Sequence, residues 1–225
     1  MRYTVTGDNL QFLNVELSAG EKLDTNAGSV AYFSGDMEIA KKSGGLIGGL
    51  KKAIGGSSLD LLTCGPSKGS GTLGLCGKLP GKIMDINVEG MSWIAQKDAY
   101  VASQPGVSAD KEMQKALGPA FGKEGLVLMK FSGKGMVFLF SLGDFNIFSL
   151  KKGETYRAAT DMAVAWESSV NYSVELNKDI RGSRRDDGPY FTVFKGPGRI
   201  IIQSMSPPRM MDMFLPLIPE PEGPA

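Results

Sequence analysis

The sequence predicts an all-β domain in which one unit recurs about three times. A strand–turn–strand phrase is clearest at residues 150–174, and related phrases begin at Leu17 and Val88. Two glycines separated by one residue also recur, at residues 69–71, 133–135 and 196–198, with β-rich sequence on both sides. Thirty glycines in 225 residues indicate many tight turns between short strands. Internal periods of this length are typical of units that bury each other's apolar faces.

The repeated phrase reads as two short strands joined by a polar turn, and the second strand of the clearest copy alternates apolar and polar residues. The three copies align on Val-Ala steps at Val30, Val101 and Val164. In two copies the turn ends in a glutamate, Glu21 or Glu154, whereas the middle copy has Met91 after its glycine. Because one copy does without this glutamate, we interpret it as a turn former rather than a catalytic residue.

Each glycine pair predicts a hairpin, since glycine supplies the positive φ that tight hairpin turns require. In the first copy, a turn centred on Ser70 would place Cys64 opposite Cys76. The Cβ atoms of such a cross-strand pair lie about 4.5–5.5 Å apart. The two thiols are therefore expected to be close enough to bridge, and to stay reduced in a cytosol. A bulge at Gly65 or Gly74 would shift this register.

These patterns divide the chain into three units. The units are 55–107, 125–174, and 188–204 completed by 1–39. Because the last unit is split between the two ends of the chain, closure of the repeat predicts that the ends lie side by side. Residues 1–206 would then form a single β domain, and residues 207–225 an apolar and then proline-rich tail.

Two connectors between the units predict short helices. Residues 44–56 place apolar residues at helical spacing opposite Lys51 and Lys52. Residues 108–117 begin with Ser108 as a plausible N-cap. The first connector and the tail carry apolar side chains that a β domain has no evident reason to display, and exposed apolar patches tend to mark interfaces. The candidate interface residues are Leu46, Ile47, Leu50, Ile54, Met210, Met213, Phe214 and Leu215.

Composition argues against several classes of function. The chain has no histidine, which removes histidine-dependent triads and most zinc or non-haem iron sites. With 25 basic and 24 acidic residues the net charge is +1, so nucleic acid is not an expected partner. Two cysteines are too few for a secreted disulfide framework. The first residues lack the apolar core of a signal peptide, and no apolar run could span a membrane, so a cytoplasmic protein is expected.

Two motifs that could indicate chemistry have structural interpretations. Residues 69–74 match the spelling G-x-G-x-x-G, but they lie on a repeated turn with no helix after it, whereas a dinucleotide site needs that helix. Asp98 and Asp161 occupy equivalent places in two repeats. They could serve acid–base chemistry, but repetition favours the backbone hydrogen bonds that aspartate makes at turns. The sequence therefore predicts no catalytic residue, cofactor or metal ligand.

Several short motifs taken together resemble a known family. They are L-x-x-G-E at Leu17 and Leu150, AGSVAY at 27–32, GGLIGGLKK at 44–52, SSL at 57–59, and QKDAYVASQPGV at 96–107. They look like the mitochondrial-biogenesis family named for altered inheritance of mitochondria, and the resemblance extends from Met1 to about Ser206. It implies a double-stranded β-helix-like or barrel fold similar to that of the trp RNA-binding attenuation protein. It implies no activity, because no catalytic residues are established for the family.

Fungal members of that family are associated with the mitochondrial inner membrane and its organising complex. The N-terminus here does not resemble a transit peptide, so a prokaryotic, cytoplasmic member is expected. The first hypothesis of function is a non-enzymatic scaffold or interaction protein that forms a homo-oligomer, with a protein or membrane surface as a further partner. The second is a module that binds a small ligand or RNA, by analogy of fold. An enzyme is the third.

Overall fold

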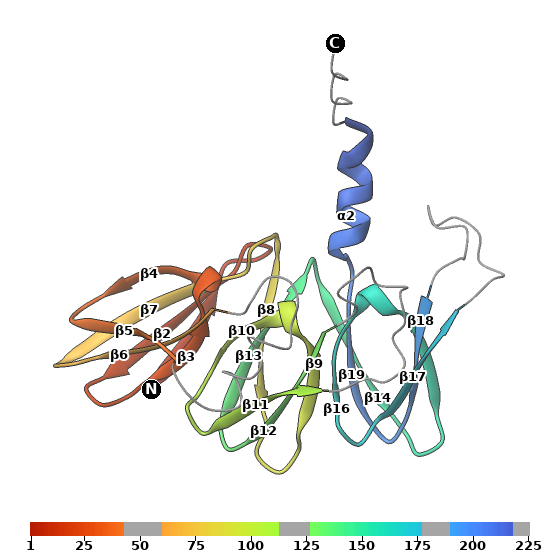
Figure 1. Cartoon of the computed structure of the whole chain (residues 1–225), viewed down its shortest axis with the longest axis horizontal. Coiled ribbons are helices and arrows are strands. Elements are labelled where there is room, and N and C mark those ends of the chain that lie inside the picture. The colour runs from red at the N-terminus through yellow and green to blue at the C-terminus, as the bar shows by residue number, and fades with distance from the viewer. Residues whose placement is uncertain (43–59, 113–126, 177–189, 218–225) are drawn as a thin grey trace.

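The computed structural model describes residues 1–42, 60–112, 127–176 and 190–217, and they are almost entirely β (Figure 1). The predicted all-β class is confirmed. The strands form open, twisted sheets, and no barrel closes within these residues. Three-residue 3-10 turns recur at Ala27–Ser29, Lys97–Ala99 and Thr160–Met162.

Four sheets, here named A to D, contain the strands. Sheet A has the order β1 (Arg2–Thr6), β2 (Phe12–Ser18), β7 (Ser70–Cys76), β4 (Val30–Ser34). Sheet B has the order β5 (Met37–Lys41), β6 (Leu61–Pro66), β3 (Leu23–Asn26), β10 (Tyr100–Ser103), β13 (Met136–Leu142), β8 (Gly81–Asn87). Sheet C has the order β11 (Val107–Glu112), β12 (Leu128–Gly133), β9 (Trp93–Gln96), β16 (Ala163–Glu167), β19 (Gly198–Gln203), β14 (Phe145–Leu150). Sheet D has the order β15 (Thr155–Ala159), β18 (Tyr190–Lys195), β17 (Asn171–Leu176).

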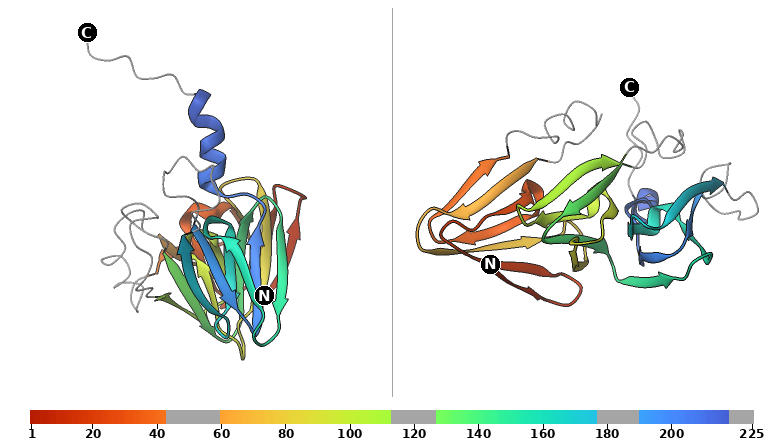
Figure 2. Two further views of the ribbon diagram at one scale, coloured as in Figure 1. Left: turned by 90° about the vertical axis from the view of Figure 1, so that its right-hand side faces the viewer. Right: turned by 90° about the horizontal axis from the view of Figure 1, so that it is seen from below.

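The sheets follow one another along the molecule (Figures 1 and 2), and an apolar core lies between each successive pair. Sheet B contributes side chains from both of its faces to two of these cores. On β8, Ile83 joins the core shared with sheet A, while its neighbour Met84 joins the core shared with sheet C. Successive side chains of a strand point to opposite faces, so one strand can supply two cores.

The paired glycines do not close hairpins, and this prediction is wrong. The strands on either side of each glycine turn belong to different sheets: β6 and β7, β12 and β13, and β18 and β19. Each turn therefore crosses from one sheet to the next, and its two arms pair with strands from elsewhere in the chain. Cys64 lies opposite Leu23 and Ile39, and Cys76 lies opposite Phe12. The two cysteines are free thiols and not a cross-strand pair.

The different surroundings of the two thiols lead to a testable difference in reactivity. Cys64 is fully buried, and burial, with a smaller contribution from Asp24, raises the pKa of its thiol to about 11. At pH 8 only about one Cys64 thiol in a thousand would be ionised, and the thiolate is the reactive form. We expect Ellman's reagent to titrate one thiol, that of the partly exposed Cys76, in the native protein and two thiols in guanidinium. The Cys76→Ser variant should lose the native reaction. Rapid reaction of two thiols per native chain would contradict the expectation.

The strand pairing also corrects how the repeat is assembled. Strands β18 and β19 pair with β14 to β17, so residues 188–204 are not completed by residues 1–39. Likewise β6 and β7 pair with strands from the first 41 residues. Each glycine turn is thus grouped with the strands that precede it, so that β1–β7 form the first unit, β8–β13 the second and β14–β19 the third. Neighbouring units are joined by the β3–β10 and β9–β16 pairs. The N-terminal strands and β17–β18 lie at opposite ends of the molecule, not side by side (Figure 1).

Irregularities in the pairing define which residues of the repeats are equivalent. A bulge interrupts the register between Val30 and Tyr32 in β4, between Tyr100 and Ala102 in β10, and between Ala163 and Ala165 in β16. Ala31, Val101 and Val164 are therefore equivalent, and the alignment on Val30 was one residue out.

The first five residues of the helix predicted at 108–117 form a strand instead, and residues 113–117 lie outside the described part of the chain. Residues 108–112 belong to β11, whose partner is β12, with Ala109 opposite Phe131. Pairing with a neighbouring strand has overridden the local helical pattern, as tertiary context often does. The other predicted helix, residues 44–56 with Leu46, Ile47, Leu50 and Ile54, lies outside the described residues.

Candidate functional site

The tail forms a helix, α2 (Pro207–Phe214), which sequence reasoning did not predict. Ser206 precedes it as N-cap, and its hydroxyl accepts a hydrogen bond from the backbone N–H of Arg209. Proline suits the first turn because the N–H groups there have no helical partner. Ser206-Pro207-Pro208 is thus a start signal that the sequence carried. A 3-10 turn at Leu215–Leu217 continues the helix.

A hydrogen-bond network holds the base of this helix to the β domain. The Ser206 side chain is fully buried, and its Oγ donates to Asp161 Oδ2 at 2.6 Å. Arg209 Nε reaches the same oxygen at 3.3 Å. Asp161 belongs to the 3-10 turn of the third unit, so the helix is anchored to the same turn that precedes β16. The helix therefore leaves the domain in a defined direction.

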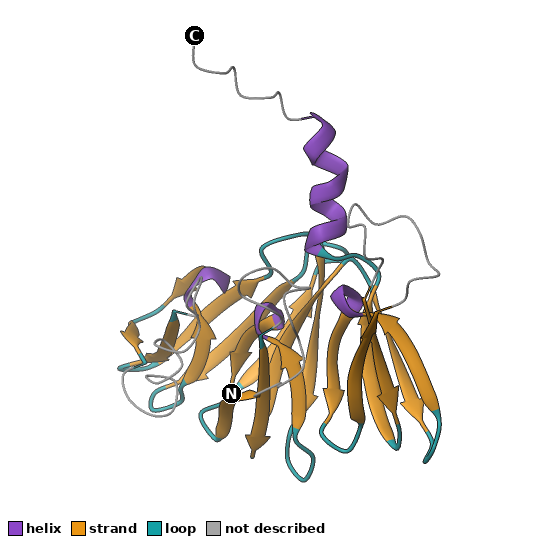
Figure 3. Ribbon diagram, turned by 45° about the vertical axis from the view of Figure 1, so that its right-hand side comes forward, coloured by secondary structure: helices purple, strands orange, loops and turns teal. Residues whose placement is uncertain are grey.

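Beyond its base, helix α2 stands away from the sheets (Figures 2 and 3), and none of its residues is buried. We name its exposed apolar side chains the α2 surface: Met211, Met213, Phe214, Leu215 and Leu217. Three of the four tail residues predicted for an interface are among them, and Met210 is half-buried. Exposed apolar surface of this kind marks interaction sites, and methionine is common on adaptable protein-binding surfaces.

The polar residues of the helix bear on the type of partner. They are Arg209 and Asp212, one cation and one anion. Binding to an anionic membrane surface is favoured by several basic residues along one side of an amphipathic helix. Helix α2 does not have that composition.

A cavity of about 220 Å³ lies beside the helix base, with Pro207, Lys78 and Asp98 among its lining residues. Other polar residues that line it already bond to the fold. Gln203 accepts from the backbone N–H of Leu142 at 2.9 Å and donates to the Asp161 carbonyl at 3.1 Å. The cavity is smaller than the ~300 Å³ or more of most sites for drug-sized ligands.

Two further residues that line the cavity are also hydrogen-bonded to the fold. The Gln96 amide donates to the carbonyl of Ala163 at 2.5 Å. The buried Tyr100 hydroxyl donates to the carbonyl of Asp24 at 3.2 Å, and burial raises its pKa, which keeps the phenol neutral. These groups stabilise the fold rather than converge on a ligand.

The carboxylates considered for chemistry have structural surroundings. Asp161 holds the helix base, whereas the equivalent Asp98 is exposed beside the cavity, and the first unit has Gly28 in this position. Glu21 and Glu154 each accept a hydrogen bond from the backbone N–H three residues earlier, both at 2.8 Å. This contact is the turn-forming role predicted for them. The G-x-G-x-x-G stretch enters strand β7 and precedes no helix, so its nucleotide interpretation is excluded.

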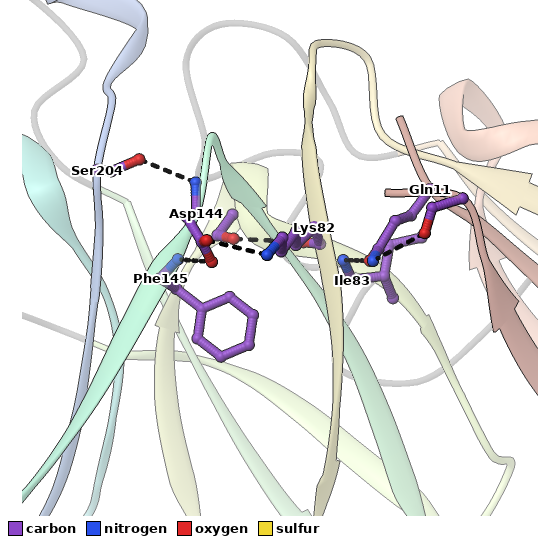
Figure 4. A network of polar contacts seen from close by, with 8 residues as sticks. Gln11, Lys82, Ile83, Asp144, Phe145 and Ser204 are labelled. Atoms are coloured by element: carbon purple, nitrogen blue, oxygen red, sulfur yellow. Dashed lines mark hydrogen bonds and ion pairs between the residues drawn. The ribbon is translucent and has the colours of Figure 1, made fainter. Parts of the chain in front are cut away.

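A polar network joins the three units at the edges of sheets B and C (Figure 4). Lys82 Nζ donates to Asp144 Oδ2 at 2.9 Å, and this contact holds the pKa of the exposed Asp144 below its usual value. The next residue, Ile83, donates its backbone N–H to Gln11 Oε1 at 2.7 Å. The network thus connects residues of all three units, and its ion pair is exposed. We interpret the network as a structural contact that aligns the three units.

The fold and the α2 surface define a repeated all-β protein with a projecting apolar helix. Its described residues contain no cluster of three or more acidic or cysteine side chains placed to hold a metal ion, and no helix among them is long and apolar enough to cross a membrane. The model of the family described as mitochondrial biogenesis AIM24 matches residues 3–205. The chain therefore belongs to this family, as its motifs indicated.

Two streptococcal proteins are similar to the chain. An uncharacterized protein of Streptococcus pyogenes serotype M6 is 26% identical over 217 residues, which cover 92% of this chain and 86% of the relative. The crystal structure of a Streptococcus pyogenes protein matches with a TM-score of 0.77 and 22% identity, covering 96% of this chain and 99% of the other. This second likeness shows the fold alone.

Proposed function

We propose that the chain is a non-enzymatic scaffold protein that associates with itself, with helix α2 as a docking element. The observation that carries the proposal is a helix anchored at its base while its apolar side chains stay in water. A fixed base lowers the ordering cost of binding, because the helix already points in one direction. A short amphipathic helix of this kind binds by laying apolar side chains into a groove.

The alternatives of ligand and RNA binding are supported less well. The cavity is small, and its lining side chains Gln96, Tyr100 and Gln203 already bond to the fold. Sheet A carries the exposed aromatic residues Phe12, Tyr32 and Phe33, on which bases could stack. However, single-stranded RNA also needs a basic track, and Arg2 on the same sheet is paired with Glu16 at 2.8 Å. The cytoplasm is the compartment that we propose, and two free thiols fit a reducing environment.

Sedimentation velocity over a range of concentrations tests the α2 surface. We expect Met213→Ser/Phe214→Ser to move the midpoint of self-association to an at least tenfold higher concentration, since loss of a buried interface side chain costs more than 1 kcal/mol at a hot spot. Folding should be unaffected, because neither side chain is buried. The matched control is Ile147→Ser, which removes an equally exposed apolar side chain from β14.

Three outcomes would overturn the proposal. They are a wild-type protein that stays monomeric at every concentration, an unchanged midpoint in the double variant, or an equal shift in Ile147→Ser. Flotation with phosphatidylcholine and phosphatidylglycerol vesicles provides a separate measurement. If the wild-type chain floats and the double variant does not, helix α2 is a lipid-binding element instead.

A further inference from the structure

The two ends of the molecule present strands with one free edge. In the described residues, β4 pairs only with β7 at the edge of sheet A, and β15 pairs only with β18 at the edge of sheet D. Sheets A and D lie at opposite ends of the molecule (Figure 1), so the two edges of one chain do not meet. An exposed strand edge is a row of unpaired backbone donors and acceptors, and it is a template for another strand.

The strand pairs between neighbouring units show which kind of strand such an edge binds. Strand β10 is equivalent to β4 and pairs with β3, while β16 is also equivalent to β4 and pairs with β9. Strands β3, β9 and β15 are equivalent in turn, because each is followed directly by a three-residue 3-10 turn. Both internal junctions therefore join a β4-type strand to a β3-type strand. In the described residues, β4 and β15 are the two strands of these types that lack such a partner.

Burial of side chains agrees with a missing neighbour. On β16, Ala165 and Trp166 are 0% and 1% exposed, whereas the equivalent Tyr32 and Phe33 on β4 are 45% and 52% exposed. The β4 sequence VAYFS also lacks the lysine and proline with which many edge strands resist pairing. Two large exposed aromatic residues on an unprotected edge are the features of an interface strand.

We propose that β4 of one copy pairs antiparallel with β15 of a second copy, so that sheet A continues into the neighbour's sheet D. The second copy is the occupant because the contact repeats the two junctions already present within the chain. In the β9–β16 junction, Ala165 lies opposite Ala95 and Trp166 opposite Ile94. The same register places Tyr32 opposite Ala158 and Phe33 opposite Arg157 of the second copy.

The side chains at this junction are compatible. Arg157 has a half-exposed side chain and reaches Glu175 only at 3.7 Å. A guanidinium beside the exposed Phe33 ring can form a cation–π contact. Each copy has one β4 and one β15, so the contact is head-to-tail and propagates into a ring or a filament. This interface is separate from the α2 surface.

Site-specific cross-linking tests the register. In a Cys64→Ala/Cys76→Ser background, one preparation carries Phe33→Cys and a second carries Arg157→Cys. Mild oxidation of the mixture should give a cross-linked dimer, since opposite residues bring Cβ atoms to about 4.5–5.5 Å. The matched control replaces Arg157→Cys by Glu175→Cys on β17, the far edge of sheet D, and should give none. No dimer in the mixture, or an equal yield with the control, would overturn the proposal.

Charge exchange tests the same pair by sedimentation. Phe33→Arg should weaken association at least tenfold, because like charges would lie directly opposite each other. Adding Arg157→Glu in the same chain should restore it. A double variant that stays as weak as Phe33→Arg would refute the pairing. Met213→Ser/Phe214→Ser should leave the cross-link yield unchanged, so failure of the α2 proposal and failure of this one are distinguishable.

Discussion

Phe138→Ala is expected to lower the free energy of unfolding by about 3–5 kcal/mol, as measured by urea denaturation. Phe138 on β13 is fully buried in the core between sheets A and B. The ring of Tyr3 meets it edge-on, with the ring centroids 4.9 Å apart. Truncation would remove a large apolar side chain and leave a cavity between two units, which the sheets cannot easily close.

The matched control for this change is Phe214→Ala on helix α2. It makes the same chemical change at a side chain that is 51% exposed and outside every core. We expect it to alter the unfolding free energy by less than about 0.5 kcal/mol, as most surface substitutions do. Equal losses in the two variants would show that the β13 core does not hold the units together.

Gly81→Ala should destabilise the protein by about 3 kcal/mol, at the upper end for overpacked sites. A Cβ atom at Gly81 would lie 2.0 Å from the Ser141 carbonyl oxygen and 2.6 Å from the Phe140 ring. The backbone N–H of Gly81 also donates to the Asn9 carbonyl at 2.7 Å. Any shift that relieves the clash would therefore disturb the junction between the first two units.

Gly90→Ala separates this packing effect from the conformational freedom of glycine. Gly90 has a φ of +79° and no atom within 4 Å of an added Cβ, so only the left-handed backbone opposes alanine. That conformation costs about 1–2 kcal/mol. Thermal unfolding of both variants should rank Gly81→Ala as the more damaging. The reverse order would mean that the Gly81 junction can relax.

Local patterns were sufficient for several features of this protein. Alternating apolar residues and repeated glycines indicated an all-β class, and short motifs indicated the family. The loss of glutamate at Met91 correctly marked Glu21 and Glu154 as turn formers, because a turn is held by contacts within a few residues. The apolar tail was correctly singled out as exposed, although the Ser206-Pro207-Pro208 signal for its helix was missed.

Which strands pair with each other could not be predicted from the sequence. Alternation tells which face of a strand is buried but not which strand lies beside it, since backbone hydrogen bonds are the same for every partner. For this reason Cys64 and Cys76 could be placed opposite each other by symmetry of a turn, whereas they lie in different sheets. The strand at 108–112 likewise forms because β12 is available to pair with it.

Strands β4 and β16 show most clearly the difference between what the sequence predicts and what the assembled sheets add. Phe33 and Trp166 occupy equivalent positions in sequences that both read as half-buried strands. Trp166 is buried against the rings of Tyr172 and Phe194 in the core between sheets C and D, and its strand pairs with β9. Phe33 is exposed on β4, the strand at which sheet A ends. Sequence patterns were enough to indicate the all-β class, the turns held by Glu21 and Glu154, and the family. Only the order of units in space decided which copy of the repeated unit keeps an open edge, because a neighbour is a property of the assembled sheets.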